Sequence, residues 1–172
     1  MAPPPVQPGY TTSLEELVWG GLLVGVTMVM HGIAMIGIMQ LYNRLKPSLE
    51  KSQSILRGIG VLILSSWLIV LSHLVEVMVW AGFFLGFGAM PNRSVSFYFS
   101  LMEYTTVGSN YNLPLRWRLL EGLLATAGLL TFAWSTAVLL TLAQEFQDRE
   151  VSYLEHRRER KKKLRSGETT PS

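Results

Sequence analysis

The sequence predicts an all-α membrane protein with three transmembrane helices. Hydrophobic residues make up 49% of the 172 residues, too large a share for an ordinary soluble domain of this length. Three apolar stretches, at 17–41, 55–87 and 119–142, can each cross about 30 Å of hydrocarbon at about 1.5 Å per residue. Twelve of the fifteen Lys and Arg residues lie within 44–57 and 149–165. A nucleic-acid-binding protein can also carry a basic tail, but basic clusters that flank apolar spans are typical of cytoplasmic segments.

The first region is expected to hold an arm and one span. Residues 1–13 are rich in proline and lack the positive start of a signal peptide, so they are expected to form a disordered extracytoplasmic arm. Ser13, followed by Glu15 and Glu16, predicts a helix start. Region 14–54 then contains the first transmembrane helix and a polar loop at 42–54, which its charges place in the cytoplasm.

The second span, at 55–87, carries Trp67 and Trp80, which are expected at the two membrane interfaces. Glycines and Pro91 end this span, and Ser94 is a candidate N-cap for a short helix at 95–104. Twelve or fewer residues are too few to cross a bilayer. Non-helical backbone at membrane depth is tolerated only where protein buries it or where it lines water.

The third span is expected at 119–142, and it is followed by a helix-compatible, strongly basic segment at 145–165. This tail, within region 144–172, is expected to lie in the cytoplasm. It has two interpretations: a surface that binds anionic lipid, at about 1 kcal/mol for each basic residue, or a solvated helix end. Residues 167–172 are expected to be disordered.

A motif at 105–111, with the sequence Thr-Thr-Val-Gly-Ser-Asn-Tyr, follows the expected short helix and precedes the third span. This arrangement resembles the pore loop of potassium channels, whose filter strand reads Thr-Val-Gly-Tyr-Gly-Asp. The chain is similar to small bacterial potassium-channel-like proteins in which one helix precedes a two-helix pore unit, here 55–143. Further matches to that group lie at 73–76, 80–81, 97–100, 117–120 and 134–137.

The resemblance implies a re-entrant pore helix, a filter loop and a homotetramer whose backbone carbonyls replace the hydration shell of an ion. The implied selectivity filter comprises Thr105, Thr106, Val107, Gly108, Ser109 and Asn110. Asn110 stands where the family has a glycine with positive φ, a conformation that Asn tolerates best among other residues. Ser109 replaces the filter tyrosine, and Tyr111 replaces an acid. Weak selectivity, a different ion and no conduction all remain open.

Other residues are assigned roles around this filter. Gly128 is expected to act as an inner-helix hinge, and side chains from 129–136 are expected to face the permeation path below the filter. Glu103 is expected to support the filter from behind, to pair with Arg116 or Arg118, or to attract ions at the mouth.

Three ionisable residues within the spans allow a different interpretation. His73 and Glu76 lie three residues apart on one helix face, and His31 can meet them from the first span. These side chains either hold helices together through hydrogen bonds, with Glu76 supporting the filter region, or bind a metal such as zinc or iron. The chain has no cysteine, no Ser-His-Asp arrangement and no Gly-rich phosphate loop, so no enzymatic activity is expected.

The sequence therefore predicts a tetrameric cation channel that passes K⁺ or another monovalent cation and needs no cofactor. The alternatives are a non-conducting scaffold or regulatory subunit, and a metal-binding membrane protein. We expect a multi-pass protein of the bacterial inner membrane, with the N-terminus outside and the C-terminus in the cytoplasm, no nucleic-acid partner and contacts to lipid.

Overall fold

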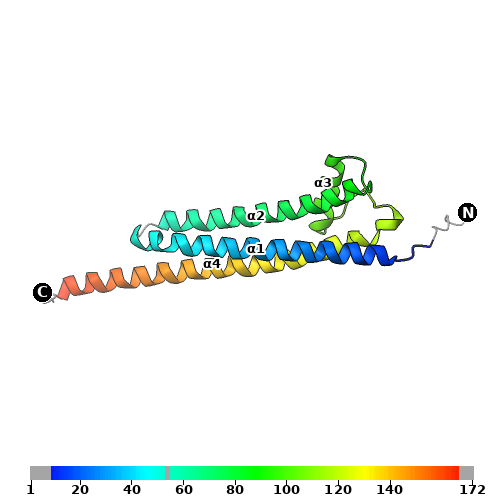
Figure 1. Ribbon diagram of the computed structural model, residues 1–172. Coiled ribbons are helices and arrows are strands. Elements are labelled where there is room, and N and C mark those ends of the chain that lie inside the picture. Colours follow the sequence, from blue (N-terminus) through cyan, green and yellow to red (C-terminus); the bar gives the residue numbers. More distant parts are fainter. Residues whose placement is uncertain (1–8, 53–54, 167–172) are drawn as a thin grey trace, which may run out of the picture. The chain divides into compact units, whose positions relative to one another are not determined.

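The computed structural model describes residues 9–52 and 55–166, and every regular element in these ranges is helical. The elements are α1 (Leu14–Ser52), α2 (Ile55–Gly86), α3 (Arg93–Tyr104), a short 3-10 helix (Leu115–Trp117) and α4 (Leu119–Ser166) (Figure 1). The predicted all-α class is confirmed.

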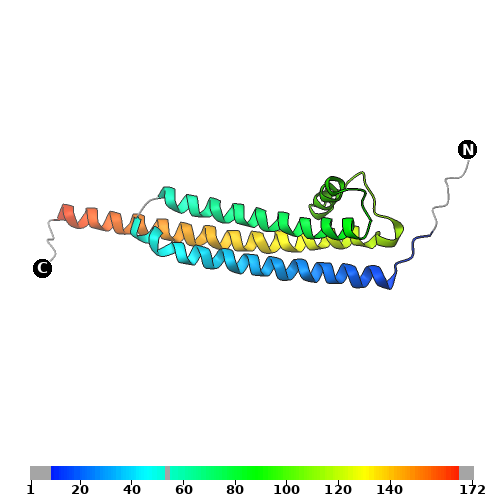
Figure 2. The ribbon, with the colours of Figure 1, turned by 45° about the horizontal axis from the view of Figure 1, so that its top comes forward.

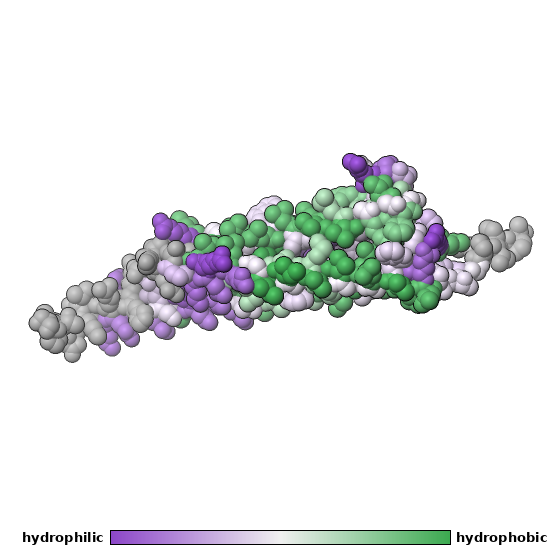
Figure 3. All heavy atoms as spheres, in the orientation of Figure 1, coloured by the Kyte–Doolittle hydropathy of each residue, from purple (hydrophilic) through white to green (hydrophobic). Residues whose placement is uncertain are grey.

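Three segments are long and apolar enough to cross a membrane: Leu14–Pro47, Ile55–Gly86 and Leu115–Glu155. Many of their large hydrophobic side chains face outward, and hydrophobic residues cover much of the face seen in Figure 3. Large exposed apolar surface is rare on soluble monomers. These properties fit a multi-pass membrane protein. The twelve residues of α3 extend only about 18 Å, too short to cross a bilayer.

The chain divides into two compact units. The first comprises Met1–Ala34 with Val70–Trp134, and the second comprises Met35–Ile69 with Ser135–Ser172. Figures 1 and 2 show α3, within the first unit, beside the end of α2 and the start of α4. The core of this unit is rich in aromatic side chains, including the fully buried Trp80, Phe84, Phe99 and Tyr104.

Glu16 connects two helix starts in the first unit. Its carboxylate accepts hydrogen bonds from the Ser13 N–H at 3.0 Å and from the Leu119 N–H at 2.9 Å. The Glu16 N–H donates to Ser13 Oγ at 3.2 Å, which completes a capping box. The expected helix start at Ser13 is therefore confirmed. The fully buried Glu16 also satisfies a backbone donor at the first residue of α4.

The expected polar loop at 42–54 is wrong for most of its length, because α1 continues through Ser52 and includes Pro47; residues 53 and 54 lie outside the described residues. Contacts within the second unit favour the helix. Tyr42 is buried, and Lys46 Nζ lies 3.0 Å from Glu145 Oε2 of α4. The basic segment after the third span is helical to Ser166, as expected.

One local prediction, the cap of the short helix, needs correction. Asn92 caps α3, and its side-chain oxygen accepts a hydrogen bond from the Val95 N–H at 3.0 Å, so Ser94 lies inside the helix. Trp80 is fully buried, and its indole N–H donates to Thr27 Oγ1 at 2.9 Å, while its place at a membrane interface stays a prediction. A buried indole needs such an acceptor. The arm at 1–8 and the end at 167–172 lie outside the described residues.

Candidate functional site

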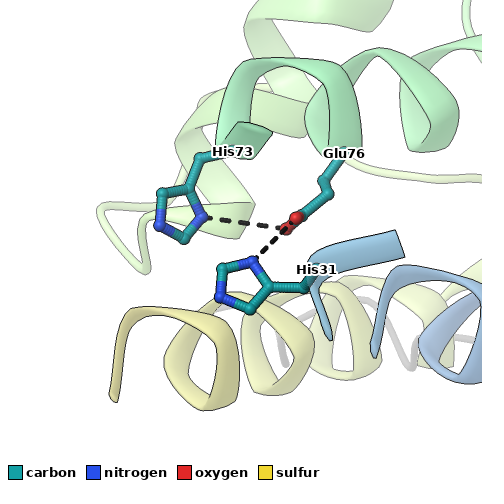
Figure 4. A group of neighbouring side chains, drawn as sticks. All are labelled: His31, His73 and Glu76. Carbon is teal, nitrogen blue, oxygen red and sulfur yellow. Dashed lines mark hydrogen bonds and ion pairs between the residues drawn. The ribbon is translucent and has the colours of Figure 1, made fainter. Parts of the chain in front are cut away.

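Five side chains from all four α-helices meet in the first unit and form what we call the polar cluster. They are His31 of α1, His73 and Glu76 of α2, Tyr104 of α3 and Thr131 of α4. His31 Nδ1 lies 2.8 Å from Glu76 Oε1, and His73 Nδ1 lies 3.7 Å from Glu76 Oε2 (Figure 4). Two predictions are thereby confirmed: His73 and Glu76 share one helix face, and His31 of α1 meets them.

Tyr104 occupies the centre of the polar cluster. Its hydroxyl donates to Glu76 Oε2 at 2.5 Å and lies 2.5 Å from Thr131 Oγ1 and 2.8 Å from His73 Nδ1. Burial raises the pKa of this phenol, and the hydrogen bond to Glu76 raises it further, so the hydroxyl keeps its proton and donates. Because Tyr104 is the last residue of α3, the polar cluster holds the helix end that leads directly into the Thr-Thr-Val-Gly segment.

The polar cluster is closed to solvent. His31 and Thr131 are 0% exposed, Glu76 and Tyr104 are 1% exposed, and His73 is 7% exposed. Aromatic rings surround the imidazoles: the Phe132 ring lies 4.5 Å from His73 and the Trp134 ring lies 5.7 Å from His31, centroid to centroid. Within the described residues Glu76 pairs with no Lys or Arg, and its partners are the two histidines and Tyr104. A buried carboxylate without hydrogen-bond partners would be very costly, and these three groups supply them.

The end of α3 forms a Schellman motif. The Val107 N–H donates to Met102 O at 3.0 Å, and the Thr106 N–H donates to Glu103 O at 2.9 Å. Thr106 takes the left-handed conformation that this motif requires, with φ of 61°. A β-branched residue rarely adopts positive φ, which costs about 1–2 kcal/mol, so this position is strained. Gly108 also has positive φ, at 79°, which glycine adopts without strain because it has no Cβ atom.

Asn110 does not have positive φ, so that prediction is wrong. Thr106 is the only non-glycine residue with positive φ in the described part of the chain. A turn centred on Ser109 explains the difference. The Ser109 hydroxyl accepts a hydrogen bond from the Tyr111 N–H at 3.2 Å and lies 3.0 Å from Tyr111 O, so Asn110 sits inside a serine turn.

Glu103 contacts the segment that follows α3, as one of its three expected roles requires. Its Oε1 accepts a hydrogen bond from the Ser109 N–H at 3.0 Å. The alternative pairing with arginine is wrong, because Arg116 pairs with Glu15 at 2.6 Å and Arg118 with Glu121 at 3.4 Å. A role for Glu103 in attracting ions stays a prediction.

Gly128 lies where α4 crosses the end of α3. A Cβ atom at this position would be 1.9 Å from the Tyr104 carbonyl oxygen. Close approach of two backbones therefore accounts for the glycine, whereas the hinge role stays a prediction. After Gly128 in the sequence, the side chains that are largely exposed are those of Leu129, Leu130 and Trp134. Thr131 and Ser135 are buried.

The positions that were expected to form a filter lie at the surface of the chain. Thr106, Val107 and Gly108 are exposed, and Val107 is 70% exposed. In the described residues, no backbone or side-chain donor reaches the carbonyls of Thr105, Thr106, Val107 or Gly108. Four consecutive carbonyl oxygens are thus available to an external cation, to water or to another chain.

The sequence did not indicate a part for Tyr104 or Thr131 in this cluster, and Glu16 was expected only at the start of the first helix. A sequence signal exists for the first, because a carboxylate within a span needs donors and Tyr104 ends the helix next to it. Thr131 could not be found in this way, since its contact depends on how α4 packs against α3.

Comparisons with known protein-family models, with curated proteins and with solved structures each find no match to this chain. The three long apolar helices fit a multi-pass membrane protein. The feature that bears most directly on function is the short helix α3 with the exposed carbonyls of residues 105–108 after it.

Proposed function

We propose that this protein is a homotetrameric channel for monovalent cations, of the potassium-channel type. The observation that carries the proposal is the run of four unpaired carbonyls at 105–108, which directly follows a helix too short to cross a bilayer. Backbone carbonyls around an axis can replace the hydration shell of an ion. The flanking apolar helices, α2 and α4, supply the two spans that a pore unit needs.

Four copies are part of the proposal, because one chain exposes this segment and cannot enclose a conduit. Unsatisfied carbonyls are costly at membrane depth unless they line water or contact protein. A ring of four chains would remove that cost by placing 105–108 around a shared axis, with α3 re-entering the membrane. The exposed Leu129 and Leu130 of α4 would then face the path or a neighbouring subunit.

The polar cluster supports this proposal because it holds the end of α3 in place. Ion coordination needs carbonyls that are held in place, and side chains locked by packing hold a site better than a free loop does. Tyr104 fixes the last residue of α3 to α2 and α4 through Glu76 and Thr131. Glu103 then holds the far side of the segment at Ser109.

A second candidate is a non-conducting membrane scaffold or regulatory subunit. Two observations favour it: the N–H groups of Val107 and Gly108 both fold back on Met102 O, at 3.0 and 3.1 Å, and Ser109 makes a local turn in place of an extended strand. A filter built this way offers fewer coordination sites than a full strand does.

Ion flux separates the two candidates. The full chain is reconstituted in liposomes, and flux is measured in K⁺ and then in Na⁺; a channel gives flux above that of empty liposomes, and its absence in both ions favours the scaffold. Gly108→Ala should reduce the flux at least tenfold, because φ of 79° is strained for alanine although no atom lies within 4 Å of the new Cβ. Gly82→Ala, at a helical glycine with equally open space, is the matched control and should conduct normally.

Oligomeric state and topology give independent checks. Crosslinking in membranes should trap four chains, and a strict monomer would contradict any pore. Cysteine labelling is clean because the natural chain has no cysteine. A label on the N-terminal arm should react from outside cells, and one in the basic tail should react only from the cytoplasm, as expected for a bacterial inner-membrane protein whose tail meets anionic lipid.

A further inference from the structure

The polar cluster contains a donor set that suits a transition-metal ion. One ring nitrogen of His31, one of His73 and a carboxylate oxygen of Glu76 all lie within 4.8 Å of one another. The two nitrogens point toward the same carboxylate, at 2.8 Å and 3.7 Å from its oxygens (Figure 4). Neighbouring donors in a tetrahedral zinc site, with bonds of about 2.0–2.1 Å, lie about 3.3 Å apart. The His31 separation, to Oε1, is shorter than that value, and the His73 separation, to Oε2, is longer. To bind an ion, the side chains would have to rotate and His73 Nδ1 would have to exchange its contact with the Tyr104 hydroxyl for the metal.

The groups around these donors also resemble the support of a metal site. The second carboxylate oxygen of Glu76 accepts the Tyr104 hydrogen bond, and Tyr104 in turn contacts Thr131. Outer hydrogen bonds of this kind orient metal-binding carboxylates. The rings of Phe132 and Trp134 cover the imidazoles and limit access by water.

Charge gives a third reason. Glu76 is 1% exposed and has no Lys or Arg partner within the described residues. A bound cation would offset the negative charge of this carboxylate, because an uncompensated buried charge is very costly.

We propose that His31, His73 and Glu76 bind one divalent transition-metal ion, of the zinc or ferrous class, which joins α1 to α2. Two imidazoles and one carboxylate select this class, because Mg²⁺, Ca²⁺ and K⁺ prefer oxygen ligands. The ion would be structural and distinct from any permeating cation. The inference is independent of conduction, since a scaffold with the same helices would bind the metal equally well.

Metal content tests the proposal directly. The full chain is purified in detergent without an affinity tag that contains histidine, is incubated with Zn²⁺ or Co²⁺, is separated from free metal and is analysed by elemental mass spectrometry. We expect about one ion per chain, as for a single three-ligand site. With Co²⁺, we expect visible absorption bands that differ from those of the aqueous ion.

Variants locate the ion. His31→Ala and His73→Ala should each reduce bound metal at least tenfold, whereas His156→Ala, which replaces the third histidine of the chain, should retain it. The wild-type Co²⁺ spectrum keeps the proposal testable even where a variant fails to fold. Absence of bound Zn²⁺ and Co²⁺ from the wild-type chain, or metal retained in a folded His31→Ala/His73→Ala chain, would each overturn the proposal.

Discussion

Replacing Gly128 by alanine tests how α4 packs against the end of α3. The added Cβ would lie 1.9 Å from the carbonyl oxygen and 2.9 Å from the carbonyl carbon of Tyr104, whereas ordinary contact begins at 3.4 Å. The obstructing atoms belong to backbone, so no side-chain rotation relieves the overlap. Either α3 or α4 has to move. Overpacking of a close contact costs about 1–3 kcal/mol, so we expect the free energy of unfolding to fall by at least that amount.

The assay is thermal unfolding in detergent, followed by circular dichroism. For a chain of this size, each kcal/mol lowers the melting temperature by about 2–4 °C. Gly122→Ala is the matched control, since it lies in the same helix and its Cβ would meet no atom within 4 Å. Alanine should stabilise that position by up to about 1 kcal/mol through its helix propensity.

The comparison of the two variants decides between packing and hinge roles for Gly128. A hinge predicts that Gly128→Ala alters flux or gating while leaving the melting temperature near that of Gly122→Ala. If the two alanine variants melt at the same temperature, the close approach of α4 to the Tyr104 carbonyl is refuted.

Three further substitutions test the polar cluster, the Schellman motif and the shared helix cap, each by thermal unfolding in detergent. Tyr104→Phe should lower the free energy of unfolding by about 1–3 kcal/mol, because the buried carboxylate loses a donor; an unchanged melting temperature would contradict the hydrogen bonds assigned to the phenol. Thr106→Gly should raise stability by about 1 kcal/mol by relieving positive φ, whereas Thr105→Gly, at φ of −84°, should lower it; effects of the same sign at both sites would exclude the strain. Glu16→Ala should cost about 1–2 kcal/mol because two helix starts lose an acceptor. The adjacent Glu15→Ala removes only an exposed ion pair and should cost less than about 1 kcal/mol, so equal losses would argue against the cap.

Several contacts of the candidate site could be predicted from residue types and their spacing in the sequence. The spacing of His73 and Glu76 placed them on one face because residues three apart are neighbours on a helix. A carboxylate inside a span required partners, and His31 was the correct one on α1. Glu103 was expected behind the filter positions, and it accepts the Ser109 N–H.

Other parts depended on contacts that sequence spacing does not encode. The burial of Trp80 depends on an acceptor on α1, Thr27 Oγ1, which the sequence spacing does not reveal. Asn110 was expected to take positive φ from its position in a motif, but the hydrogen bonds that close the end of α3 place that conformation four residues earlier, at Thr106.

The sequence by itself determined that the chain is helical, that three stretches are apolar enough to cross a bilayer and that a shorter helix lies between the second and third. Each of these properties depends only on the composition and length of one stretch of the chain, and not on contacts with other stretches. Only the tertiary structure decided that Tyr104, His31, Glu76 and Thr131 meet at one point and that Gly128 touches a backbone carbonyl. The two residues of each hydrogen-bonded pair in the cluster lie 27 to 45 positions apart in the sequence. They meet because the helices pack against one another, and local conformational preference does not determine that packing.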